Sequence, residues 1–193
     1  MLLCRCSSDR LCFWNATANT HLSPIEESKG QPAAAPTPKS TKVFLEPFRD
    51  ERFDKTVVGT VRNGLGMRTA DVVPTNSVPV WVTEAIRTEL INSGYTVTNG
   101  APPSTSSPGN ILISGDVLDV FCDMYMSYSG RVSFVAKVKD SRGELLNKHY
   151  NGEGSAGMAI GGASDSYAQS LSLALSNAIK KFIADLEEKL SRR

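Results

Sequence analysis

The sequence predicts an α+β fold, in which a mixed, mostly antiparallel sheet of about five strands carries two helices on one of its faces. Three patterns lead to this prediction. Residues 131–139 alternate between apolar and polar side chains, as a half-buried strand does. Two separate segments repeat apolar residues every three or four positions, as amphipathic helices do. Each helix then needs a sheet face to cover its apolar stripe, which places the protein in the broad α/β class.

The first strands are expected soon after residue 40. Thr41–Phe48 is a short run of β-formers closed by Pro47, and Val57–Val61 is a weaker extended piece. The segment that follows, VRNGLGMRTADVV at Val61–Val73, contains two glycines that favour a loop or a bulged connection.

A helix is predicted to begin after Asn76 or Ser77, with Pro79 in its first turn, where a missing N–H costs nothing. Gly94 is expected to end it. Tyr95–Thr98 is then the next strand, parallel to the first one because a helix connects them. The apolar positions of this helix are Val78, Val82, Ala85, Ile86 and Leu90.

The second half of the chain predicts antiparallel strands followed by a long helix. We expect a long strand over Ile111–Tyr128 with a turn at Ser129–Gly130, then Arg131–Lys139, a turn at residues 140–143, and a last strand near Leu145–Tyr150. The final helix would be capped by Ser164 or Asp165. Its apolar face consists of Tyr167, Leu171, Leu175, Ala178, Phe182, Leu186 and Leu190.

Composition excludes several classes of protein. The 193 residues include 21 basic and 20 acidic ones, a formal net charge of +1, which argues against a nucleic-acid partner bound through its phosphates. No apolar run approaches the roughly 18 residues of a membrane-spanning helix. Residues 22–40 are rich in proline, alanine and serine and are typical of a linker. We therefore predict a disordered tail and linker over residues 1–40 and a single α/β domain over residues 41–193.

The N-terminal residues contain three cysteines, Cys4, Cys6 and Cys12. Their spacing lacks the second pair that a zinc site needs, so no metal is predicted. Leu2–Ser8 followed by a proline-rich tether resembles the end of a bacterial lipoprotein signal, which makes Cys6 the candidate for lipid attachment. Arg5 departs from that pattern, because a small residue is expected before the lipid-bearing cysteine.

Three further patterns invite a catalytic interpretation. Gly152–Gly157 reads G-x-G-x-x-G, but no helix begins directly after it, so no nucleotide or other cofactor is expected and a glycine-rich connection is favoured. Asp119 and Asp123 share one face of the predicted long strand, with Asp116 opposite unless a bulge intervenes. They are the candidates for a hydrolase, although Lys137 and Lys139 on the next strand offer ordinary ion-pair partners. No G-x-S-x-G motif accompanies His149, and Cys122 lies among apolar neighbours, so no catalytic residue is predicted in the leading interpretation.

The candidate binding loop consists of Arg62, Asn63, Gly64, Gly66 and Arg68. Its two arginines and its asparagine suit an anion, and the glycines would let backbone N–H groups approach a ligand. A bulged connection between strands explains the same residues without any ligand.

Taken together, KVFLEPFRDER, the VRNGLGMRTADVV segment, VPVWVTEAIRTELINSGYTV and the terminal helix resemble bacterial envelope lipoproteins of the YajG-like kind. The resemblance covers roughly residues 41–190. It implies a small α/β domain on the periplasmic face of a membrane, the outer membrane above all, held there only by a lipid and without known enzymatic activity.

We therefore expect a non-enzymatic binding or assembly module of the cell envelope. The alternative is a hydrolase that uses Asp119 and Asp123. The expected partner is an envelope protein or a second copy of the chain, bound through a sheet edge or the Arg62–Arg68 loop. A homodimer is one form that such edge pairing would take.

Overall fold

The computed structural model describes residues 16–22, 39–101, 109–157 and 163–192. Strand β7 (Asn110–Tyr125) is the central strand of its sheet. Along one edge, β7 pairs antiparallel with β8 (Ser127–Asp140), and β8 pairs antiparallel with β9 (Gly143–Ala156). Along its other edge, β7 pairs in parallel with three short strands in succession. These are β2 (Lys42–Leu45), β3 (Arg49–Asp50) and β4 (Gly59–Arg62).

Further strands extend the sheet at both ends of that row. Strand β6 (Thr96–Asn99) pairs in parallel with β2, as the sequence predicts. Strand β5 (Arg68–Pro74) pairs antiparallel with β4, and β1 (Ala16–Thr20) pairs in parallel with β5. The described residues thus form a nine-stranded sheet, which corrects the expected number of about five. Strands β1, β3 and β5 lie where no strand was expected from the sequence, and β5 is the second half of the segment expected to be a loop.

A β-bulge in β7 determines which side chains face the core. Between Val117 and Asp119 the register with β8 shifts, so Leu118 is an extra residue on β7. Ile111, Ile113 and Val117 are buried before the bulge, and Val120 and Cys122 are buried after it. The change from odd to even numbers keeps an apolar face toward the core over the whole strand.

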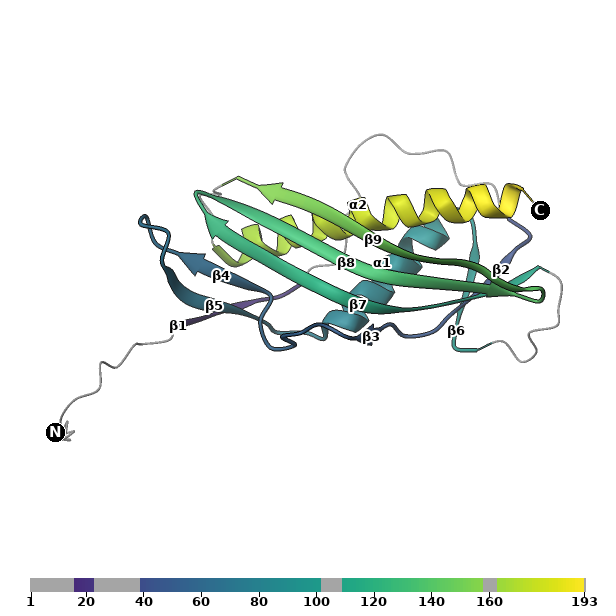
Figure 1. Cartoon of the computed structure of the whole chain (residues 1–193), viewed down its shortest axis with the longest axis horizontal. Coiled ribbons are helices and arrows are strands. Elements are labelled where there is room, and N and C mark those ends of the chain that lie inside the picture. Colours follow the sequence, from purple (N-terminus) through teal and green to yellow (C-terminus); the bar gives the residue numbers. More distant parts are fainter. Residues whose placement is uncertain (1–15, 23–38, 102–108, 158–162, 193) are drawn as a thin grey trace, which may run out of the picture.

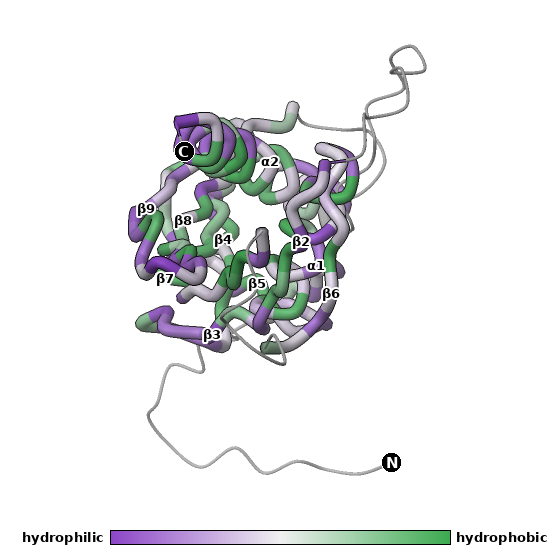
Figure 2. The backbone as a smooth tube through the Cα atoms, turned by 90° about the vertical axis from the view of Figure 1, so that its right-hand side faces the viewer, coloured by the Kyte–Doolittle hydropathy of each residue, from purple (hydrophilic) through white to green (hydrophobic). Residues whose placement is uncertain are grey.

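Both helices lie on the same side of the strands β7, β8 and β9 (Figure 1), and the view along the long axis agrees (Figure 2). Helix α1 (Val78–Asn92) begins after Ser77, and Gly94 takes a left-handed φ of 87° after its end, both as predicted. Helix α2 (Ala163–Ser191) buries the predicted apolar face, with Tyr167, Phe182 and Leu186 all inaccessible to solvent or nearly so. The predicted α/β class with two helices is confirmed.

Glycines in β8 and β9 let α2 approach the sheet closely. A Cβ at Gly130 would lie 2.7 Å from the Ser170 carbonyl oxygen. At Gly152 it would lie 2.0 Å from the Ala174 oxygen. The turn predicted at Ser129–Gly130 is therefore wrong, because these residues lie inside β8 and the chain turns at Met126. The G-x-G-x-x-G segment, expected to be a connection, is part of β9 except for Gly157, and its glycines Gly152 and Gly154 lie against α2.

Residues 16–22 belong to the sheet and its core, although the sequence places them in the N-terminal tail. Leu22 is buried, and its backbone N–H and carbonyl are both bonded to the Asn76 side chain, at 3.0 and 3.1 Å. Asn76 thus ties this segment to the start of α1. Most of the predicted linker, and Cys6 with it, lies outside the described residues.

Candidate functional site

The three aspartates of β7 all lie on the outer face of the sheet, away from the helices. The bulge at Leu118 brings Asp116 onto the same face as Asp119 and Asp123, which is the exception that the sequence pattern left open. The candidate hydrolase residues are therefore part of a row along one strand. They lie on an open sheet face, and neither described depression of the surface includes them.

Asp116 is held by two cations from neighbouring strands. Lys137 Nζ donates to one carboxylate oxygen at 2.9 Å, as the sequence allowed, and Arg49 Nε donates to the other at 2.8 Å. Burial by itself would raise the pKa of Asp116, but the hydrogen bonds from Lys137 and Arg49 outweigh it and lower that pKa. The carboxylate is thus kept ionised and satisfied.

Asp119 and Asp123 are each paired with a different arginine. Arg131 Nε donates to Asp119 at 2.5 Å, and Arg62 Nε donates to Asp123 at 2.8 Å. The bond from Arg62 lowers the pKa of Asp123, which also accepts a bond from the Thr60 hydroxyl at 3.1 Å. A lowered pKa does not suit Asp123 as the general acid of a hydrolase, and the geometry of both aspartates is that of an ion pair.

The candidate binding loop is the tip of the β4–β5 hairpin, and Asn63 organises it. The N–H groups of Leu65 and Met67 both donate to Asn63 Oδ1 at 3.0 Å. The Gly66 N–H donates to the Asn63 carbonyl at 2.8 Å. These three backbone donors, which an anion would need, are used within the turn itself.

The two arginines of the loop also have partners. Besides Asp123, Arg62 binds the Gly66 carbonyl through Nη1 at 3.1 Å. Arg68 Nε donates to Asp71 at 2.6 Å. The loop therefore offers a bound ligand fewer free donors than its composition suggests.

What this tip presents to solvent is apolar. Leu65 is 83% exposed and Met67 is 57% exposed. The neighbouring tip, where β7 turns into β8, exposes Tyr125 by 45% and Met126 by 78%. The sequence analysis did not single out this second tip. The signal was available, since a tyrosine and a methionine occupy a hairpin turn where glycine, asparagine or aspartate is usual.

Cys122 and His149, the two other residues considered for catalysis, lie in different surroundings. The Cys122 thiol is buried next to the Ser170 hydroxyl at 3.0 Å, and burial raises its pKa to about 11, which disfavours the reactive thiolate. His149 is an exposed residue of β9.

An open depression of about 410 Å³ lies at the start of α1, lined in part by Arg52, Lys55 and Pro79. Arg52 is buried, but its guanidinium is bound to Asp50 and to the carbonyls of Lys55 and Val57. Its charge is therefore neutralised within the fold.

Within the described ranges, His, Cys, Asp and Glu form no group of three that could hold a metal ion. No helix in those ranges is long and apolar enough to cross a membrane.

These features define a class of protein: an α+β domain with an ion-paired outer sheet face and apolar hairpin tips. No family model matches the sequence, and no curated protein is significantly similar to it. Similar folds are nevertheless found among solved structures. A protein of the DUF330 family from Xanthomonas campestris superimposes with a TM-score of 0.58 at 11% identity, over 92% of this chain and 96% of its own.

A hypothetical protein from Chlamydia trachomatis gives a TM-score of 0.52 at 12% identity, over 80% of this chain and all (100%) of its own. The lipoprotein GNA1162 from Neisseria meningitidis gives a TM-score of 0.37 at 11% identity, over 79% of this chain and 99% of its own. That score is too low to support an inference. The first two comparisons establish that this chain has the same fold as two bacterial proteins.

Proposed function

We propose that the protein is a non-enzymatic binding or assembly module of the bacterial cell envelope, similar to YajG-like lipoproteins. It would be attached to a membrane, the outer membrane above all, by a lipid on Cys6, with the domain facing the periplasm. The observation that carries the non-enzymatic part is the pairing of all three β7 aspartates with arginine or lysine. The fold shared with bacterial proteins and the Leu2–Ser8 segment support the remainder.

The proposed partner is an envelope protein or a second copy of the chain, bound at a sheet edge or at the Arg62–Arg68 loop. The edges differ in how open they are. On β9, the carbonyls of Asn151 and Glu153 accept hydrogen bonds from Lys181 and Asn177 of α2. Among the described strands, β6 pairs with β2 alone and β1 pairs with β5 alone, so their outer edges are the more suitable ones for strand addition or a homodimer.

Lipid attachment is tested in a bacterial host that acylates lipoproteins, with the chain expressed from its own upstream sequence. We expect mass spectrometry of the membrane fraction to find an acylated N-terminal cysteine at position 6. Cys6→Ser should move the protein to the soluble periplasmic fraction, whereas the matched variant Cys12→Ser should stay in the membrane. An unmodified Cys6 in a membrane-bound protein would disprove the anchor.

The non-enzymatic proposal is tested with the double variant Asp119→Asn, Asp123→Asn in a broad screen for hydrolase activity. We expect no activity in either the parent or the variant. Activity in the parent that disappears in a folded variant would establish the hydrolase alternative instead.

A further inference from the structure

Two hairpin tips that touch each other expose large apolar side chains at one end of the molecule. The β4–β5 tip carries Leu65 and Met67, and the β7–β8 tip carries Tyr125 and Met126. A Cβ at position 66 would lie 3.6 Å from the Tyr125 ring, so the tips are in contact. Both lie at the end of the molecule where β1 begins (Figure 1). We refer to these four residues as the apolar tip.

Met126 occupies a backbone conformation that does not suit it. Its φ of 64° is the one positive value at a non-glycine residue within the described part of the chain. A glycine or asparagine would take this turn position with less strain. A methionine that is both strained and 78% exposed indicates that the apolar side chain itself is needed there.

The charges behind the apolar tip cancel one another. Arg62, Arg68 and Arg131 lie on the strands that lead into the two tips, and each forms an ion pair with an aspartate, respectively Asp123, Asp71 and Asp119. The region therefore has guanidinium groups that could meet lipid headgroups, but no excess of positive charge. Any attraction to a membrane would have to come from apolar insertion rather than from anionic lipid.

Strand β1 begins at this same end of the molecule. Ala16 is paired with Ala70 and Thr20 with Pro74, so β1 begins beside the start of β5, next to the tip. Cys6 precedes Ala16 by ten residues, a span of at most about 35 Å when extended. A lipid on Cys6 could therefore lie in the same bilayer that the tip touches.

The size and shape of the apolar tip favour a bilayer over a protein partner. A stable protein interface buries roughly 800 Å² on each partner. The tip offers four side chains on two protruding turns, of which Tyr125 is already half buried. A soft lipid surface can receive such protrusions without a matching cavity, and tyrosine is typical of the membrane–water interface.

We propose that the apolar tip inserts into the headgroup region of a lipid bilayer and is a second membrane contact beside the lipid on Cys6. The inference rests on the proposed function, because it extends the membrane attachment described there. The lipid would hold the chain at one point that precedes β1, whereas the tip would be a contact made by the folded domain itself. It would also hold the long axis of the sheet at a defined angle to the membrane.

The experiment separates the tip from the lipid by using the full chain with Cys6→Ser, which cannot be acylated. Its binding to vesicles of phosphatidylethanolamine with a minority of phosphatidylglycerol is measured by flotation at high lipid concentration. We expect the triple variant Leu65→Ser, Met67→Ser, Met126→Gly to bind about tenfold more weakly, because three buried apolar contacts are lost. Added salt should change the binding of the parent little.

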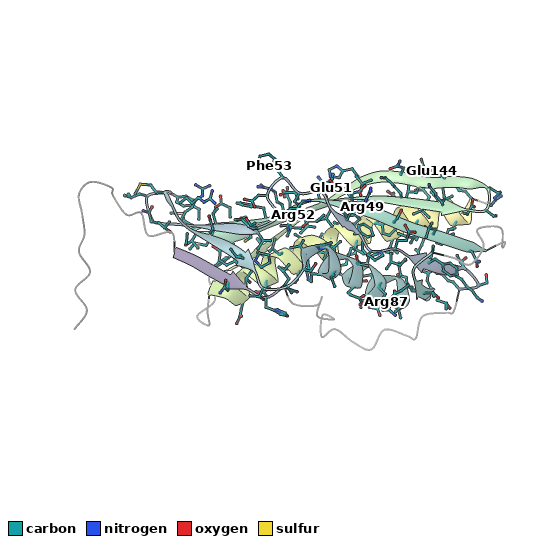
Figure 3. The ribbon with its side chains drawn as sticks, turned by 90° about the horizontal axis from the view of Figure 1, so that it is seen from below. Arg49, Glu51, Arg52, Phe53, Arg87 and Glu144 are labelled. Carbon is teal, nitrogen blue, oxygen red and sulfur yellow. The ribbon has the colours of Figure 1, made fainter. Side chains whose placement is uncertain are left out.

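Phe53→Ser is the matched control, since Phe53 is a large apolar residue that is even more exposed than the tip residues, but on the loop between β3 and β4. Figure 3 shows its ring pointing away from the ribbon, remote from the hairpin tips. This variant should bind vesicles as the parent does. Urea unfolding of each variant establishes that any loss of binding comes from a folded protein.

A depth measurement gives a second, independent readout. A tryptophan introduced as Tyr125→Trp should be quenched by lipids with brominated acyl chains, whereas Phe53→Trp should not be. Failure of the parent to bind, equal binding by the triple variant, or absence of quenching at position 125 would each overturn the proposal. A change of oligomeric state in the triple variant with unchanged vesicle binding would assign the tip to a second copy instead. None of these outcomes bears on acylation, which is read separately by mass spectrometry of Cys6.

Discussion

The two turns at the ends of β8 both connect antiparallel strands, but one consists of polar residues and glycine and the other exposes an apolar side chain. At the β8–β9 turn, the Arg142 N–H donates to the Asp140 carboxylate at 2.8 Å, and Gly143 takes a φ of 125° without a Cβ to strain. At the β7–β8 turn, an exposed methionine takes a φ of 64°. The first turn has the aspartate and glycine that are common in hairpin turns, and the second has a methionine where such residues are usual.

This difference shows where the fold favours stability and where another requirement overrides it. Both turns join long antiparallel strands of one hairpin series, so pairing alone would be satisfied by similar turns. The polar turn lies at the end of the molecule opposite to the start of β1, and the apolar turn lies at the same end as the start of β1 (Figure 1). A costly residue at only one of two equivalent turns indicates a role for that end of the molecule.

The largest expected effect on the free energy of unfolding is at β8 and β9, where glycines let α2 pack closely on the sheet. Gly152→Ala would place a Cβ 2.0 Å from the Ala174 carbonyl oxygen and 2.6 Å from the Ala178 nitrogen, so helix and sheet must separate. We expect a loss of about 3 kcal/mol or more in the free energy of unfolding, measured by urea denaturation.

Gly64→Ala is the matched control for that substitution, because no atom lies within 4 Å of a Cβ at position 64. Its unfolding free energy should change by less than about 0.5 kcal/mol. Equal effects of the two variants would mean that α2 does not lie as close to β9 as the structure shows.

Substitution at the β8–β9 turn should lower stability, whereas substitution at the β7–β8 turn should not. Gly143→Ala forces a side chain into a left-handed conformation and should cost about 1–2 kcal/mol. Met126→Gly relieves that strain and should leave stability unchanged or raise it by up to about 1 kcal/mol. Thermal and urea unfolding measure both variants. Destabilisation by Met126→Gly would show that this methionine has a packing role, which would remove the argument from strain.

The outer sheet face between the turns should make stability sensitive to acid. The folded pKa of Asp116 lies below the unfolded value of 3.8, because Lys137 and Arg49 hold the carboxylate. The stability that this pair contributes is therefore fully present above pH 3.8 and is lost as the pH falls through the folded pKa. Asp116→Asn should lower stability at neutral pH by about 1 kcal/mol and flatten its decline in acid. An identical acid profile in parent and variant would contradict the assignment.

The smallest effect on stability is expected at the two arginines of the candidate binding loop, Arg62 and Arg68. Arg62→Ala with Arg68→Ala should leave the melting temperature nearly unchanged, because the two side chains are 37% and 55% exposed and solvent-screened ion pairs contribute little to stability. The same double variant should recover less of a partner in a pull-down from envelope extract, if the loop binds one. If the double variant unfolds while its recovery of partners is unaffected, the loop is only a structural connection between two strands.

Local patterns in the sequence were sufficient for much of the fold. The limits of α1, the alternation in β8 and the apolar face of α2 all follow from residue spacing, which reflects the geometry of one element at a time. For the outer face, Lys137 and Lys139 were expected from the sequence to be ion-pair partners, and Lys137 pairs with Asp116. Asp119 and Asp123 pair instead with arginines that were not expected as their partners. The bulge at Leu118 was not predictable, because an extra residue becomes apparent only when two strands are aligned.

The sequence by itself determined the α/β class, both helices and the identity of the aspartates on β7. Only the tertiary structure decided that Gly130 and Gly152 serve helix packing, because a close approach involves atoms far apart in the chain. It likewise decided that Leu65 and Met126 lie at one end of the molecule. Two turns separated by about sixty residues become neighbours only through the pairing of β4 with β7, and residue spacing within either turn carries no trace of that pairing.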